Sequence, residues 1–142
     1  MKYGIALILA FFTGVAQAAL DWDVALGGEQ RDEASRARDD FRHPRQTLEF
    51  FGLKEGMTVL EVSPGSGWYT EVIAPLLKGN GTYYAAHFGL NSHLAYYRNS
   101  LGQYLQKLAA NNDLYRDVII TELQPPERVV AAPQGSVDLA VT

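Results

Sequence analysis

A short apolar segment that ends in a glycine-containing turn places the strongest constraint on the fold of this chain. Residues 57–62 read MTVLEV, and the turn that follows, residues 63–67, reads SPGSG. A compact, mostly apolar run is typical of a strand that is buried on both faces, as strands of parallel sheets are. The sequence therefore predicts a buried strand that leads through the turn into a helix, because Trp68, Val72 and Leu76 follow at helical spacing.

Strand and helix patterns continue to alternate after this first unit. Residues 82–87 (TYYAAH) are rich in strand-forming side chains, and a longer helix is expected from Asn91 or Ser92 to about Ala110. The remaining expected elements are a strand at residues 117–121, an irregular connection from Pro125, and a strand at residues 137–141. Such alternation implies parallel strands with right-handed crossovers. We therefore expect an α/β fold with a Rossmann-like, doubly wound parallel sheet.

A polar, charge-rich segment, residues 19–45, precedes the sheet. Its mixture of acids and bases is typical of a solvated helix, in which Asp32 and Arg36 form an i,i+4 ion pair. We expect this segment to form an N-terminal arm. We also hypothesise that Arg42 and His43, near its end, fold over the cleft.

Residues 1–18 have the pattern of an export signal. Lys2 supplies a positive charge, and residues 4–14 (GIALILAFFTG) form an apolar segment that is short for a membrane span. Ala16-Gln17-Ala18 matches the small-x-small pattern of signal peptidase, so cleavage is expected after Ala18. The alternative is an uncleaved anchor. With cleavage, the protein is expected in the periplasm or outside the cell, without a stable membrane span.

Charge and residue content disfavour or exclude several classes of function. The chain has a formal net charge of −4, which argues against a nucleic-acid partner. It has no cysteine, so disulfides, thiolate metal ligands and a cysteine nucleophile are excluded. Its histidines, His43, His87 and His93, lack the close spacing of a zinc site, so no metal is expected.

The glycine turn narrows the choice of ligand. In a doubly wound sheet, the first strand-to-helix turn borders the crevice where ligands bind, and glycines let a ligand approach the backbone. The dinucleotide fingerprint G-x-G-x-x-G is not met, because Thr70 stands at its third glycine. A Walker loop is excluded, because no lysine follows the glycines before Lys78. Glycines also occur in tight turns that bind no ligand, so the alternative to a ligand-binding turn is a purely structural one.

The turn resembles motif I of the class I S-adenosylmethionine-dependent methyltransferases, in which an acid on the first strand is followed by glycines at alternate positions. The matching positions are Glu61, Ser63, Gly65 and Gly67. From Arg42 onward, RHPRQTLEFFGLKEGMTVLEVSPGSGWYTEVIAPLL, YYAAH and SVDLAVT together resemble a little-characterised group of exported, predicted methyltransferases. The resemblance implies the class I methyltransferase fold, S-adenosylmethionine as cofactor, and a methyl acceptor that is unknown.

The resemblance also implies which residues bind the cofactor. An acid near the turn balances positive charge on the cofactor, while backbone N–H groups donate to its carboxylate. His87 stands where most of these enzymes place the acid that binds both ribose hydroxyls, and a histidine cannot accept twice as a carboxylate does. No catalytic residue is assigned. The expected cofactor-binding residues are Glu61, Ser63, Pro64, Gly65, Ser66, Gly67, Trp68 and His87.

One alternative function and one expectation about length accompany this interpretation. The alternative, mildly favoured by His87, is an exported, non-catalytic ligand-binding module on the same fold. The class I methyltransferase fold has more strands than residues 46–142 supply, and the strand at residues 137–141 would leave an unpaired apolar edge. We therefore expect residues 46–142 to be the N-terminal part of a methyltransferase-like domain, incomplete at the C-terminus.

Overall fold

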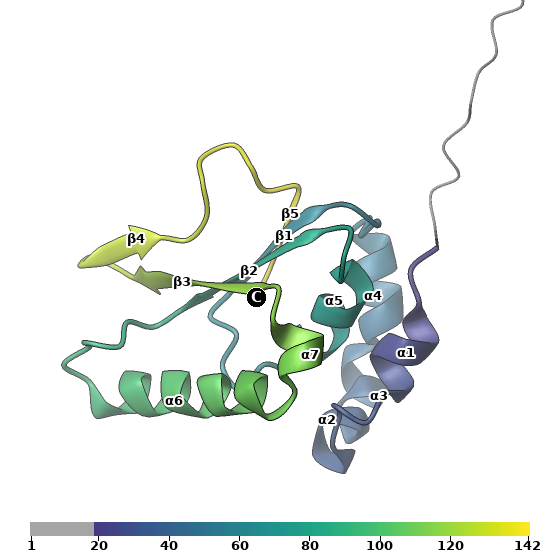
Figure 1. The fold of residues 1–142 in the computed structure, drawn as a ribbon, viewed down its shortest axis with the longest axis horizontal. Coiled ribbons are helices and arrows are strands. Elements are labelled where there is room, and N and C mark those ends of the chain that lie inside the picture. Colours follow the sequence, from purple (N-terminus) through teal and green to yellow (C-terminus); the bar gives the residue numbers. More distant parts are fainter. Residues whose placement is uncertain (1–18) are drawn as a thin grey trace, which may run out of the picture.

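The computed structural model describes residues 19–142 of the chain (Figure 1). The predicted export signal, residues 1–18, lies outside the described residues, so its cleavage stays a prediction. None of the helices in the described part of the chain combines the length and the apolar character that a bilayer span needs.

One mixed sheet organises the described residues. Its strand order is β4-β3-β2-β1-β5, and all neighbouring strands are parallel except β3 and β4, which pair antiparallel. The strands are β1 Thr58–Val62, β2 Thr82–His87, β3 Val118–Gln124, β4 Arg128–Val130 and β5 Leu139–Val141. The strand order reverses at β1, because β1 lies between β2 and β5. In open α/β sheets, the crevice at such a reversal is where ligands bind.

Helices connect the parallel strands and also precede the sheet. α5 (Thr70–Leu77) joins β1 to β2, and α6 (Ala95–Ala110) and α7 (Asn112–Tyr115) join β2 to β3. The helices that precede β1 are α1 Trp22–Gly27, α2 Glu33–Ala37, α3 Asp39–Arg42 and α4 Pro44–Phe50. The predicted alternation of strands and helices, and with it the Rossmann-like α/β fold, is therefore confirmed.

One strand was not expected from the sequence. β4 lies inside the connection that was predicted to be irregular, and it pairs with the last residues of β3, where Glu122 is in register with Val130. β3 itself continues to Gln124, beyond the expected end at residue 121. A strand as short as Arg128–Val130 gives no alternating pattern that a sequence analysis detects, because its pairing partner defines it.

The two faces of the sheet are covered to different degrees. Along β1, Val59 and Glu61 are buried, whereas Leu60 and Val62 on the opposite face are only half-buried. The buried face packs on the helices, and Figure 1 shows α5, α6 and α7 on the same side of the sheet. The hydrophobic core therefore lies between this face and these helices. Its fully buried members include Leu48, Val59, Val72, Ile73, Ala85 and Tyr104.

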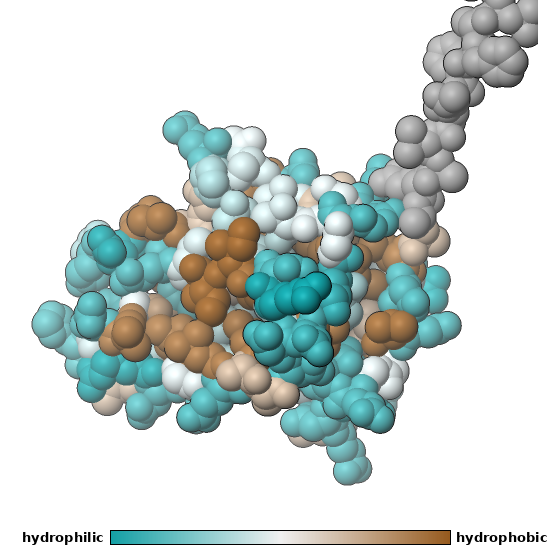
Figure 2. Space-filling model, viewed as in Figure 1, coloured by the Kyte–Doolittle hydropathy of each residue, from teal (hydrophilic) through white to brown (hydrophobic). Residues whose placement is uncertain are grey.

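Apolar side chains on the opposite face stay accessible to solvent. Ile119 of β3, in register with Tyr84 on that face, is 42% exposed, and Val129 of β4 is 66% exposed. Figure 2 shows apolar surface over the region that β3 occupies in Figure 1. Parallel sheets are normally covered on both faces. Among the described residues, helices cover one face of this sheet, and apolar side chains such as Ile119 and Val129 on the other face stay exposed.

The N-terminal arm differs from the solvated helix that we expected, because it packs onto the domain. Trp22 and Ala25 of α1 are part of the core, and Arg31 is only 2% exposed. The Arg31 guanidinium donates to both carboxylate oxygens of Asp39, at 2.5 and 2.8 Å. Its Nε lies 3.5 Å from Oε2 of Glu71, a buried residue of α5. A cation this deeply buried needs anionic partners, and here α3 and α5 supply them.

The predicted ion pair between Asp32 and Arg36 is replaced by hydrogen bonds to the backbone. Asp32 caps α2, where its carboxylate accepts from the Ser35 N–H at 2.7 Å. Arg36 donates to the carbonyl of Gly28 at 2.9 Å. A side chain that hydrogen-bonds a free backbone group at a helix end stabilises the helix more than an exposed ion pair does.

Replacing Arg31 should detach the arm from the domain. In Arg31→Met, Glu71 keeps Lys107 as a partner, but Asp39 loses both hydrogen bonds. Removing one member of a buried ion cluster typically costs about 3–5 kcal/mol. We expect amide hydrogens of α1 and α2 to exchange with solvent at least about tenfold faster.

Arg128→Gln is the matched control, because Arg128 lies outside the arm and forms an exposed pair with Glu122 at 3.1 Å. An exposed pair contributes about 0–1 kcal/mol, so exchange in the arm should change little. Unchanged protection of α1 and α2 in Arg31→Met would show that the buried ion cluster does not hold the arm.

Candidate functional site

The turn between β1 and α5 has left-handed backbone at every second residue. Ser63 has φ of 55°, Gly65 of 59° and Gly67 of 83°. The turn is tied to β2 by the Ser63 N–H, which donates to the carbonyl of Ala86 at 2.9 Å. For a serine, this conformation costs roughly 1–2 kcal/mol, because its Cβ crowds the following carbonyl. The first glycine position of the motif therefore requires positive φ, and Ser63 adopts it.

The two glycines of the turn serve different purposes. A Cβ on Gly67 would lie 3.0 Å from Cε2 of Tyr104 and 3.3 Å from Cδ of Lys107, both on α6. Gly67 thus lets α6 pack closely against the turn. A Cβ on Gly65 would meet no atom within 4 Å. Open space for a ligand therefore adjoins Gly65, whereas side chains of α6 fill the space beside Gly67.

Free backbone donors lie beside this open space. Among the described residues, the N–H groups of Gly65 and Ser66 have no hydrogen-bond acceptor, while the Gly67 N–H donates to the carbonyl of Pro64 at 2.9 Å. Ser66 is exposed and Gly65 half-buried, so solvent reaches both. Adjacent N–H groups of this kind bind anionic or hydroxyl oxygens.

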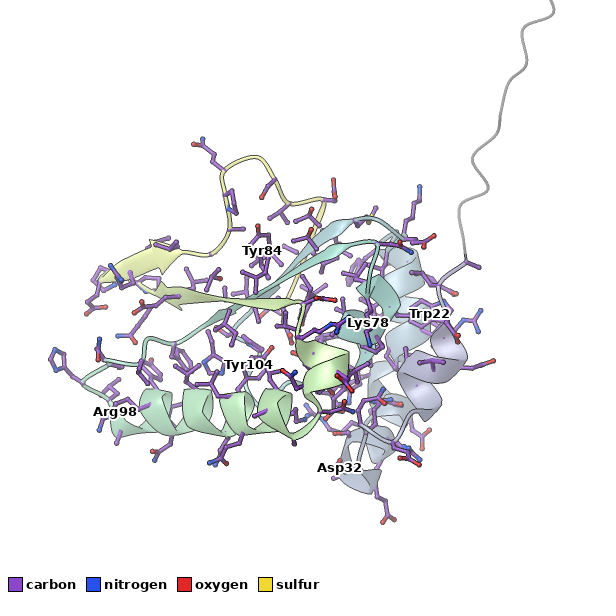
Figure 3. All side chains as sticks on the ribbon, in the orientation of Figure 1. Trp22, Asp32, Lys78, Tyr84, Arg98 and Tyr104 are labelled. Atoms are coloured by element: carbon purple, nitrogen blue, oxygen red, sulfur yellow. The ribbon has the colours of Figure 1, made fainter. Side chains whose placement is uncertain are left out.

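Glu61 lies beneath the turn, in contact with side chains of the protein. Its Oε2 accepts from the Thr70 hydroxyl at 2.7 Å and from the Tyr83 hydroxyl, and the residue is 2% exposed. The Thr70 hydroxyl also lies 2.9 Å from that of Tyr104, which Figure 3 shows between α6 and the sheet. Burial raises the pKa of Glu61, although the two hydroxyl hydrogen bonds oppose the shift.

This environment gives Glu61 partners within the protein, and its expected role in balancing the charge of a ligand stays a prediction. Its carboxylate connects β1 to the first residue of α5 and to Tyr83 of β2. None of the three hydroxyl residues around Glu61, namely Thr70, Tyr83 and Tyr104, was predicted from the sequence to lie beside it. No local pattern points to them, because these residues meet Glu61 only in the folded protein.

His87 also has protein partners at both ring nitrogens. Nδ1 accepts from the Phe88 N–H at 2.8 Å, so Nε2 carries the proton and donates to the carbonyl of Gly65 at 3.2 Å. The side chain is fully buried, and burial lowers its pKa. Both ring nitrogens thus have partners within the protein, and the expected contact of His87 with a ribose stays a prediction. The ring fixes the Gly65 peptide, whose neighbouring N–H groups are free.

Trp68 and Pro64 are both buried at the turn. The Trp68 indole N–H donates to the carbonyl of Ser35 at 2.9 Å, so the ring faces the arm. Arg42, which we expected to fold over the cleft, has its guanidinium 4.9 Å from the centre of this ring. The arm is thereby anchored to the turn itself.

A polar hollow of about 290 Å³ lies elsewhere on the carboxyl edge of the sheet. It is lined by Asn91, Ser92, His93, Glu122, Gln124, Glu127 and Arg128. Within this lining, the Glu122 carboxylate pairs with Arg128 at 3.1 Å. In residues 19–142, no group of three or more carboxylate or histidine side chains is arranged to hold a metal ion.

Comparison with known proteins supports the fold and the class. No protein-family model and no curated protein matches this chain. Its structure is similar to that of a SAM dependent methyltransferase from Aquifex aeolicus, with a TM-score of 0.56 and 25% sequence identity. The match covers 73% of this chain and 49% of the other, so this chain spans about half the length of that methyltransferase. The fold is Rossmann-like, and its likeness to this methyltransferase supports the methyltransferase class.

The raised pKa of Glu61 predicts a specific pH dependence. A carboxyl whose pKa is higher in the folded protein stabilises the fold below its ordinary pKa of 4.5. That contribution is lost as the pH rises through the folded value. Glu61→Gln removes the titration and keeps an acceptor for Thr70 and Tyr83. We expect the unfolding free energy of the original chain, minus that of Glu61→Gln, to fall as the pH rises from about 4.5 to 8.

The measurement is urea denaturation of both chains across this pH range. All other carboxylates are shared, so their titrations cancel in the difference. A difference that does not change with pH would mean that Glu61 titrates alike in the folded and unfolded chain.

Proposed function

We propose that this protein is an S-adenosylmethionine-dependent methyltransferase that acts on a still unknown acceptor. One observation carries the proposal: the free N–H groups of Gly65 and Ser66 border open space at the carboxyl end of β1, where the strand order reverses. The sheet around them resembles that of a SAM dependent methyltransferase. Ligands of open α/β sheets bind at this position.

The residues present fit such a cofactor at the turn. Backbone N–H groups at Gly65 and Ser66 suit its carboxylate or a ribose hydroxyl, and a Cβ at position 65 would fill the space that they border. Ser63, Pro64 and Trp68 shape the same turn. When bound, the cofactor supplies a methyl group on a positively charged sulfur, which is open to attack by a nucleophile.

The contribution of the chain's own side chains is to hold this turn in place. Glu61 fixes the start of α5 through Thr70, and His87 fixes the Gly65 peptide through its carbonyl. Neither side chain is available to an acceptor, because both are buried. In this proposal, the protein accelerates methyl transfer by orienting the reactants, which contributes several kcal/mol when the geometry is close to that of attack.

Calorimetric titration with S-adenosylmethionine and S-adenosylhomocysteine tests the proposal. We expect saturable binding, weakened at least about tenfold in Gly65→Ala, because the added methyl group stands in front of the free N–H groups. Gly135→Ala is the matched control. Gly135 also has positive φ, 73°, and a Cβ at this position would likewise meet no atom within 4 Å, but it lies far along the chain in the β4–β5 connection.

The control separates loss of the site from backbone strain. Equal weakening in both variants would assign the effect to strain, and no binding heat at about millimolar ligand would overturn the proposed function. Binding without transfer to any acceptor tested would instead favour the non-catalytic binding module.

We also propose that further polypeptide completes this domain. The support is physical: the face of the sheet that carries Ile119 and Tyr84 keeps apolar surface exposed, and the outer edge of β5 has no partner among the described residues. Uncovered apolar faces and free strand edges promote association. The purified 142-residue chain should therefore self-associate in size-exclusion chromatography. A monomer that unfolds in one sharp transition would contradict this proposal.

A further inference from the structure

Two arginines of the arm converge on the tryptophan that ends the glycine turn. The guanidinium carbon of Arg42 lies 4.9 Å from the centre of the Trp68 ring, and that of Arg38 lies 5.6 Å from it. Arg38 and Arg42 are one helical turn apart on α3 and its N-cap, and both are exposed. We call these two residues the arginine pair.

The arginine pair has neither an ion pair nor a side-chain hydrogen bond within the described residues, whereas Arg31, Arg36 and Arg45 of the arm each have at least one of the two. Arg31 also approaches Trp68, at 5.7 Å, but Asp39 and Glu71 neutralise it. Among the described residues, neither Arg38 nor Arg42 forms an ion pair, and neither side chain donates a hydrogen bond to the protein. Ten guanidinium N–H bonds, five on each arginine, therefore remain free for another molecule.

The two positive charges of this arrangement favour an anion beside them. Like charges one helical turn apart repel each other, and here both are held against the same ring. The negative face of the ring compensates only part of this repulsion. Two planar guanidinium groups beside the same aromatic ring can both donate to a carboxylate or a phosphate, to which arginine binds with paired hydrogen bonds.

The position of the pair links it to the turn. Trp68 follows Gly67 directly, and its indole N–H is fixed to Ser35 of the arm at 2.9 Å. An anion held by Arg38 and Arg42 therefore lies on the arm side of the same turn that presents the free N–H groups of Gly65 and Ser66. We propose that the arginine pair on Trp68 is an anion-binding subsite for a carboxylate or phosphate group of a ligand. The assignment of that ligand as acceptor or cofactor rests on the proposed function, whereas anion binding itself does not.

Trp68 is a built-in reporter of this subsite, because the chain has only one other tryptophan, Trp22. In Trp22→Phe, we expect inorganic phosphate, titrated to about 10 mM, to change the fluorescence of Trp68 in a saturable way. Sodium chloride at the same ionic strength should not reproduce the change, because general screening is not specific for the anion. The response should disappear in the Arg38→Gln/Arg42→Gln double variant.

Arg45→Gln provides the matched control. Arg45 lies 5.7 Å from the centre of the Trp22 ring, but Glu49 neutralises it, so its loss should leave the phosphate response intact. If Trp22→Phe does not fold, the same titrations in the original tryptophan background, compared between the double variant and Arg45→Gln, give the same information. A response equal to that of chloride, or one that survives in the double variant, would overturn the proposal.

A second pair of titrations identifies the source of the anion. S-adenosylhomocysteine carries an amino-acid carboxylate, and 5′-methylthioadenosine has the same nucleoside without it. If the subsite binds the carboxylate of the cofactor, the double variant should weaken binding of the first compound at least about tenfold and leave the second unchanged. If the subsite binds an acceptor, both compounds should bind the double variant normally, while the phosphate response is lost.

These titrations also separate the two proposals. Absence of binding by either adenosine compound would overturn the proposed function, yet a phosphate response that depends on Arg38 and Arg42 would still support the subsite. Normal binding of both compounds without any phosphate response would support the cofactor and overturn the subsite.

Discussion

The buried carboxylate of Glu61 is the interaction on which the geometry of the turn depends. It accepts hydrogen bonds from Thr70 at the start of α5 and from Tyr83 of β2, so one side chain connects three elements. A buried carboxylate is costly unless its oxygens are satisfied, and a misplaced helix would leave this one without donors. The position of α5 relative to the sheet is thereby restricted. The free N–H groups of Gly65 and Ser66 depend on this restriction, since they lie between the two anchored elements.

A second buried group, Glu71, connects the arm to the same helix. Its carboxylate pairs with Lys107 of α6 and approaches Arg31, which in turn binds Asp39 of α3. This ion cluster holds the arm against the start of α5, where Trp68 contacts the carbonyl of Ser35. The arm is consequently part of the site. Arg38 and Arg42 lie beside the turn because α3 and its N-cap place both guanidinium groups next to the Trp68 ring.

The sequence predicted the elements of the domain well and the arm poorly. β2 was found at the predicted residues, and α6 and the other predicted strands differ from expectation by a few residues. These elements have strong local patterns of apolar side chains. The arm looked solvated because it is rich in charges, and burial of Arg31 depends on Glu71, which lies 40 positions away in the sequence. Local charge content does not reveal such a partner.

The sequence by itself determined that a buried strand leads through SPGSG into a helix, since apolar runs and glycines act on their own stretch of backbone. It also placed Glu61 and His87 at the ends of neighbouring strands. Only the tertiary structure decided what these two side chains contact. Tyr83, Thr70 and the Gly65 carbonyl satisfy them inside the protein. Hydrogen bonds between distant residues form only after packing brings the elements together, so the direction of a polar side chain is not encoded in its own segment.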